Sequence, residues 1–156
     1  MNVHAVPHLA DRPETDADAL SDLWIREHLK IDNPEVATAI KTVLQHSTEM
    51  IRQGFYVGPF ATDRTSAWHP NGDLIQDDLI DAQAAWRMIQ QLPDSKLDQV
   101  VAEKQAAVEL LDTDHTMLQK LMKKENQSVL DPMMSTLIYT SAMFQTIHNL
   151  FEGLIA

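Results

Sequence analysis

Apolar residues along this chain recur every three to four positions, the spacing that places them on one face of an α-helix. Pro and Gly fall almost entirely between the runs that show this spacing, and both residues commonly end helices. The pattern therefore predicts an all-α fold, a single-domain bundle of about five helices in which each helix buries one apolar stripe.

The expected helices begin at residues that cap helix N-termini. Thr15 is expected to cap a first helix that ends near Lys30. Asn33 is expected to cap the second, with Pro34 at its first position and Gly54 at its end. The remaining helices are predicted at about 73–92, 95–126 and 131–156, with a kink at 112–114 left open.

Two segments lack an apolar face. Residues 1–14 are expected to form a flexible N-terminal arm that precedes a helical bundle domain spanning 15–156. Residues 55–72 are expected to form one long inter-helix loop, which contains Arg64, Trp68 and other aromatic residues. The sequence leaves open whether this loop is a lid that binds a partner or a plug that covers one end of the bundle.

The clearest apolar stripe is predicted on the 95–126 helix. Lys104 interrupts it, and we expect its ammonium group to extend to the edge of the bundle. His115 also interrupts it, and we expect a buried imidazole there that needs a hydrogen-bond partner or a metal. We interpret His115 as a core residue rather than a ligand. The predicted stripe is Leu97, Val101, Lys104, Val108, Leu111, His115, Leu118 and Met122.

The other histidines do not predict a metal site. His46 with Glu49, and His148 with Glu152, have spacings that could hold a metal, but each pair lies opposite the apolar face of its helix. We therefore expect both to be solvated side-chain pairs. The Glu-x-x-His motif of carboxylate-bridged di-iron bundles does not occur in the sequence.

Aspartates cluster where the 73–92 helix is expected to begin. Asp77, Asp78 and Asp81 would stack along one side of that helix, where like charges repel unless a cation joins them. The alternative is that these residues, with Asp73, favour the positive end of the helix dipole and solvate its surface.

A second acidic motif follows along the chain, formed by Glu109 and Asp112. The DDxxD and ExxD pair resembles the magnesium site of the all-α nucleotide pyrophosphohydrolases, although aspartates replace the usual glutamates at Asp77 and Asp78. The resemblance implies a Mg²⁺ ion held by these four residues and Asp81, one of which orients the attacking water. Outside this alternative we expect no cofactor.

The composition excludes several other kinds of site. The chain has 156 residues and no Cys, which excludes disulfides, thiolate metal sites and cysteine nucleophiles. The glycine-rich phosphate loops and the Gly-x-Ser-x-Gly turn of serine hydrolases are also absent from the sequence. A leader peptide and a membrane span are not predicted, so we expect a cytoplasmic protein.

The charge balance indicates the kind of partner. The chain has 23 acidic and 12 basic residues, a net charge of −11, which disfavours direct binding to nucleic acid or to anionic membranes. We therefore expect an acidic interaction or regulatory protein, rather than an enzyme, that binds a protein with a basic face. The sequence leaves self-association open. The expected contact residues are Asp73, Asp77, Asp78, Asp81, Arg64 and Trp68.

Overall fold

The computed structural model of the chain confirms the predicted all-α fold. It describes residues 7, 9–58, 75–76, 79–80, 82–122 and 127–156. The α-helices of these residues are α2 (Ala17–Trp24), α3 (Pro34–Phe55), α5 (Ala82–Ile89), α6 (Leu97–Leu121) and α7 (Gln127–Ile155). Shorter elements are the π-helical turn η1 (Ile25–Leu29), the 3₁₀ turn η3 (Asp94–Lys96) and the two-residue strands β1 (Ile75–Gln76) and β2 (Leu79–Ile80).

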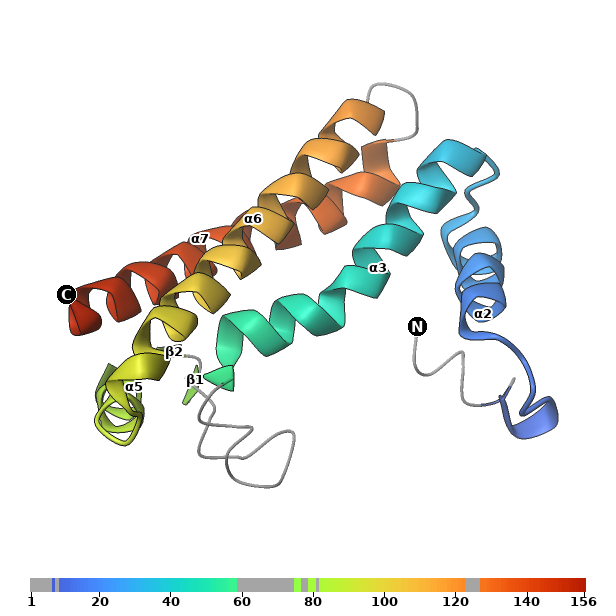
Figure 1. Cartoon of the computed structure of the whole chain (residues 1–156). Coiled ribbons are helices and arrows are strands. Elements are labelled where there is room, and N and C mark those ends of the chain that lie inside the picture. Colours follow the sequence, from blue (N-terminus) through green and yellow to red (C-terminus); the bar gives the residue numbers. More distant parts are fainter. Residues whose placement is uncertain (1–6, 8, 59–74, 77–78, 81, 123–126) are drawn as a thin grey trace.

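The three long helices form the centre of the molecule. α6 packs extensively against both α3 and α7, whereas α3 and α7 contact each other only slightly. Figure 1 shows that α3 and α7 run in the same direction and that α6 runs antiparallel to both. α2 and η1 pack beside the beginning of α3, and α5 packs against α7.

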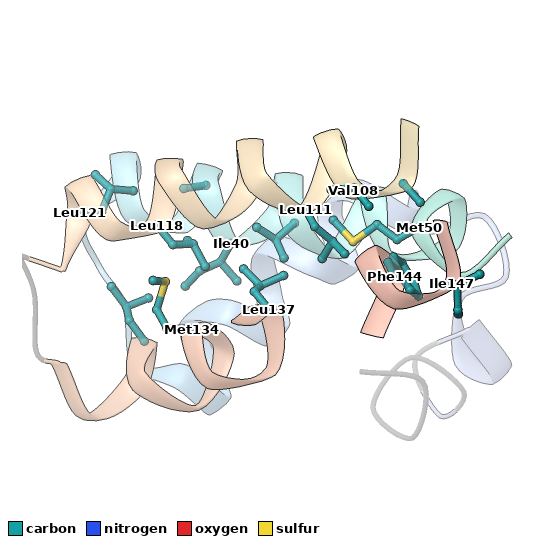
Figure 2. Close-up of a cluster of buried hydrophobic side chains, with 14 of the residues drawn as sticks. Ile40, Met50, Val108, Leu111, Leu118, Leu121, Met134, Leu137, Phe144 and Ile147 are labelled. Carbon is teal, nitrogen blue, oxygen red and sulfur yellow. The ribbon is translucent and has the colours of Figure 1, made fainter. Parts of the chain in front are cut away.

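The hydrophobic core lies between α6 and its two neighbours. Leu111 and Leu118 of α6 are completely buried, and Ile40 of α3 and Ile147 of α7 are buried with them. Figure 2 shows these side chains, with Phe144 and Met50, pointing into the space enclosed by the three helices. A helix with neighbours on two sides buries a wide face, which explains why α6 contributes so many residues to the core.

The beginning of α3 agrees with the sequence prediction. The Asn33 side chain accepts hydrogen bonds from the backbone N–H groups of Glu35 (3.0 Å) and Val36 (3.4 Å), and Pro34 is the first helical residue. These bonds satisfy amides that have no partner within the helix. The helix ends one residue beyond Gly54 rather than at it.

Gly54 allows α3 and α7 to approach each other closely. A Cβ atom at this position would lie 2.1 Å from Cζ of Phe144, far inside van der Waals contact. The Phe144 ring is almost fully buried and packs edge-on against Phe55, with ring centroids 4.9 Å apart. Gly54 therefore serves packing here rather than helix termination.

Three expected helix boundaries differ from the structure. α2 is capped by Asp16, which accepts a hydrogen bond from the N–H of Asp18 at 3.1 Å, whereas Thr15 bonds back to the Arg12 carbonyl. α7 begins at Gln127, so Pro132 stands inside the helix rather than at its start. α6 begins at Leu97, after η3, and continues without a break through 112–114, where the sequence also allowed a kink.

The prediction of a helix over 73–92 needs the largest correction. Ile75 pairs with Ile80, and Gln76 with Leu79, as a small antiparallel ladder. The helix α5 begins only at Ala82. A ladder of two-residue strands does not change the fold class. Successive side chains of a strand point to opposite faces, so the residues of the ladder do not share one helix face.

Candidate functional site

Two charged groups lie inside the molecule on α6, and neither is the residue that the sequence analysis placed there. His115 is only half-buried, which corrects the prediction of a buried imidazole at this position. The neighbouring Asp114 is fully buried. Lys104 does not reach the edge of the bundle and is only 1% exposed. The buried face of α6 consists of Val100, Lys104, Ala107, Val108, Leu111, Asp114, Leu118 and Leu121.

Asp114 is paired with His46 of α3. Nδ1 of His46 lies 2.9 Å and 3.2 Å from the two carboxylate oxygens, and an ionised carboxylate can only accept, so the ring N–H is the donor when Asp114 is charged. Burial raises the pKa of Asp114 above its ordinary value, and the hydrogen bond from His46 opposes this shift. The prediction of a solvated His46–Glu49 pair was wrong, because Glu49 pairs with Arg52.

Lys104 holds the end of α3 in place. Its Nζ atom donates to the Gln53 carbonyl oxygen at 2.5 Å, to the Tyr56 carbonyl oxygen and to Oε1 of Glu103 at 2.7 Å. The two carbonyl groups stand at the C-terminus of α3, where the last turn has no intrahelical donors. Burial lowers the pKa of Lys104, and the adjacent Glu103 carboxylate opposes this shift.

Glu103 extends this cluster beyond the helix. Its carboxylate also accepts the backbone N–H of Gly58, at 3.0 Å and 3.1 Å from the two oxygens, and its side chain is 9% exposed. Lys104 Nζ lies 5.7 Å from the centre of the Phe151 ring of α7. An ammonium has three N–H donors, and here all three have acceptors within the protein. The cluster therefore joins helices and has no donor available for a substrate.

His148 is largely buried, and the polar side chains near its ring nitrogen belong to its own helix. Its Nδ1 atom lies 3.4 Å from the Asn149 side-chain oxygen and 3.5 Å from the Gln145 side-chain nitrogen. Glu152, its expected partner, is exposed. The predicted His148–Glu152 pair is therefore corrected in the same way as the pair at His46.

The ExxD carboxylates are exposed and engaged separately. Glu109 accepts a hydrogen bond from Gln105 at 2.9 Å, and Asp112 accepts one from Ser141 of α7 at 3.3 Å. In the part of the chain that the structure describes, no three His, Asp or Glu side chains are grouped closely enough to hold a metal ion. The predicted partner-contact residues, which include the aspartates of the DDxxD motif, lie outside the described residues: Arg64, Trp68, Asp73, Asp77, Asp78 and Asp81.

An apolar groove opens between α3 and α7, with α6 beneath it. Its volume is about 460 Å³, and Leu111 of α6 forms its floor. The α3 wall consists of Val43, Ser47, Met50, Ile51 and Phe55. The α7 wall consists of Pro132, Met133, Thr136, Leu137, Thr140 and Phe144. We call this surface the α3–α7 groove.

The α3–α7 groove is uncharged and closes toward one end. None of its lining residues is Asp, Glu, Lys or Arg. The hydroxyls of Ser47 and Thr136 donate to carbonyls of their own helices, at 2.6 Å and 2.9 Å, so these side chains add little polarity. The groove ends where Gly54 lies against Phe144. Ile51 in the α3 wall is 47% exposed, although it is a large apolar residue.

A second hollow, of about 640 Å³, lies between the first half of α3 and the last half of α6. It is lined partly by threonines, of which Thr38, Thr42 and Thr113 donate to carbonyls of their own helices. Charged residues also line this hollow, among them Glu35 and Lys120, which distinguishes it from the α3–α7 groove.

Sequence reasoning missed both the buried pairs and the groove. The signal for the groove was present, because the stretch from Pro132 to Phe151 contains no Asp, Glu, Lys or Arg. Within the described residues, no helix has the length and apolar character that crossing a membrane requires. Comparisons of the chain with protein-family models, with curated proteins and with solved structures find no match.

Proposed function

We propose that this protein is a non-enzymatic interaction protein, of the inhibitor, immunity or adaptor type, that binds a partner protein with a basic face. The binding surface in this proposal is the α3–α7 groove. The observation that supports this proposal is that the three long helices leave the uncharged α3–α7 groove open. In a four-helix bundle, a further helix covers the corresponding apolar side chains.

The charge of the chain supports a basic partner. A net charge of −11 attracts a positively charged protein over long range and speeds its encounter with the acidic one. Contact through an uncharged groove then requires little desolvation of ions. In this proposal, charge selects the partner and apolar contact in the groove provides the affinity.

The buried ionic groups of the described residues also support a role without chemistry. Lys104, Glu103 and Asp114 are engaged with protein groups and lie away from the groove lining. Groups that are held so deeply stabilise the arrangement of α3 and α6 instead of meeting a ligand.

The test compares two threonines on α7. Thr136 lines the groove, whereas Thr146 lies elsewhere on the helix; both are exposed and both donate to the carbonyl four residues earlier at 2.9 Å. Thr136→Arg and Thr146→Arg change the net charge equally. We expect a basic protein from the source cells to purify in stoichiometric amount with the wild type and Thr146→Arg, but not with Thr136→Arg.

Salt provides the second arm of the test. Retention of this partner is expected to fall between about 0.05 M and 0.5 M salt, because screening shortens the reach of the attraction. If the Thr136→Arg protein retains the same partner as Thr146→Arg, the groove is not the binding surface. If the wild type retains no basic protein at low salt, the proposed function is wrong.

A further inference from the structure

The shape of the α3–α7 groove fits one helix. Its walls extend from Val43 to Phe55 on α3 and from Pro132 to Phe144 on α7. At the rise of an α-helix, each wall is about 18 Å long, roughly three turns. We propose that the groove binds a single amphipathic α-helix of the partner, with its apolar face inward and basic residues on its outer face. This inference rests on the proposed function and specifies the partner's binding element.

The walls favour an apolar helix face that repeats over three turns. Met50 lies in the α3 wall and Met133 in the α7 wall, and flexible methionines adapt to varied apolar side chains. The hydroxyls of Ser47 and Thr136 are already bonded to backbone carbonyls. The groove therefore selects side chains at positions i, i+3 or i+4, and i+7 by shape and burial rather than by polar contacts.

The charges beside the groove determine which sign of charge is favoured on the outer face of the bound helix. α7 contains Asp131 and Glu152 and no Lys or Arg. On α3, Lys41 is bonded to Asp22 at 3.0 Å, and Arg52 is paired with Glu49. Both cations of α3 are thus neutralised, whereas Asp131 directly precedes the groove residue Pro132. The charge next to the groove is acidic, and the complementary outer face of the bound helix is basic.

The direction of the bound helix follows from its neighbours. α3 and α7 are parallel to each other, so a helix between them that runs the opposite way has its dipole aligned favourably with both. It also completes an antiparallel bundle. The narrow end at Gly54 and Phe144 then meets the beginning of the bound helix, where we expect small residues such as Ala or Gly.

A second copy of this chain is a poorer occupant. Two copies each carry a net charge of −11, so their approach is opposed by like charge. The Asp131 carboxylate would then face another acidic protein. The basic partner helix has no such penalty, and sedimentation velocity of the protein alone separates the two cases.

The experiment uses a synthetic 14-residue peptide with leucines and alanines on one helical face and lysines on the other. A scrambled peptide of the same composition is the control for charge alone. Binding is measured with ¹³C-methyl-methionine NMR of the full chain. We expect the methyl signals of Met50 and Met133, which line the groove, to shift, while those of Met88 and Met117 remain in place.

The variants test the same geometry by fluorescence anisotropy of the labelled peptide. We expect the affinity to fall at least roughly tenfold for the scrambled peptide and for Thr136→Arg, and to change less than about twofold for Thr146→Arg. Equal binding of both peptides, or shifts at Met117 in place of Met50, would overturn the helix-in-groove inference. Those results leave the proposed function intact, because that proposal is tested separately by the natural partner.

Sedimentation gives the remaining outcome. We expect the protein without peptide to be monomeric at micromolar concentration. A dimer that Thr136→Arg dissociates and Thr146→Arg preserves would show that a second copy occupies the groove, and this would also overturn the inference.

Discussion

His46 of α3 is hydrogen-bonded to Asp114 of α6, and the Asp114 side chain is fully buried. The two residues are 68 positions apart in the sequence, so the fold brings them together. A buried carboxylate is stable only when its charge is compensated or its proton is retained. The pair therefore couples the packing of α3 on α6 to pH.

Asp114→Asn is expected to change the pH dependence of stability. The folded-state pKa of Asp114 lies above its ordinary value, so the folded protein binds more protons than the unfolded chain between the two values. The contribution of Asp114 is then largest at acidic pH and is lost as pH rises through its folded-state pKa. Asparagine does not titrate, so the variant loses no stability in this way. The free energy of unfolding of the variant minus that of the wild type should therefore increase as pH rises.

The measurement is urea denaturation of both proteins at a series of pH values from about 4 upward. The quantity compared is the difference between the two free energies of unfolding. A difference that stays constant with pH, or that favours the wild type at higher pH, would contradict the raised pKa of Asp114.

His46→Ala should destabilise the protein more than His115→Ala does. Removing the imidazole of His46 leaves the buried Asp114 carboxylate without this donor, which typically costs about 1–3 kcal/mol. His115 lies one residue further along α6 but is only half-buried. Thermal unfolding of the two alanine variants compares them directly, and a larger loss for His115→Ala would support the core histidine predicted from the sequence.

Lys104→Met should be strongly destabilising, by about 3–5 kcal/mol, because it leaves a buried Glu103 carboxylate and two carbonyl groups without their cation. Glu103→Gln removes the charge but keeps an acceptor for the N–H of Gly58. The double variant should lose less than the sum of the two single losses. Denaturant unfolding of all four proteins measures this coupling, and additive losses would mean that the ion pair contributes nothing.

Gly54→Ala should destabilise the protein although alanine favours helices over glycine by about 1 kcal/mol. The added methyl group would meet the buried Phe144 ring, and overpacking of this kind costs about 1–3 kcal/mol. Adding Phe144→Leu should recover part of the loss in thermal unfolding. A rise in melting temperature for Gly54→Ala alone would show that α3 and α7 are not in close contact.

Magnesium should leave the melting temperature unchanged if the protein has no metal-dependent activity. Ligands that bind only the folded state raise this temperature, so a thermal-shift panel with millimolar Mg²⁺ and Mn²⁺ is a direct test. Asp78→Ala is the informative variant, because Asp78 belongs to the DDxxD motif. A metal-induced rise that this variant abolishes would favour the pyrophosphohydrolase alternative over the proposed function.

Several features could be predicted because they depend on neighbouring residues in the sequence. Asn33 and Pro34 start α3 through bonds that span three residues, so their pattern alone identifies the helix start. The prediction that a helix begins near residue 73 failed for the opposite reason. The local spacing suits a helix, but Ile75 and Ile80 pair with each other in the fold.

The buried face of α6 shows why periodicity alone was insufficient. Two sets of positions with alternating spacings of four and three share Lys104, Leu111 and Leu118. One set adds Val101, Val108 and His115, and the other adds Val100, Ala107 and Asp114. The first set looks more apolar, and we predicted that set as the buried face. The structure buries every residue of the second set, and Asp114 of this set meets His46 of α3.

The sequence by itself determined the all-α class, the start of α3 and the acidic charge, since these depend on local spacing and composition. Only the tertiary structure decided which polar groups are buried. Lys104 and Asp114 are tolerated in the interior because Gln53, Tyr56 and His46, all distant in the sequence, supply their partners. The α3–α7 groove was likewise decided by packing, because it exists only where α3 and α7 both lie on α6 without covering each other.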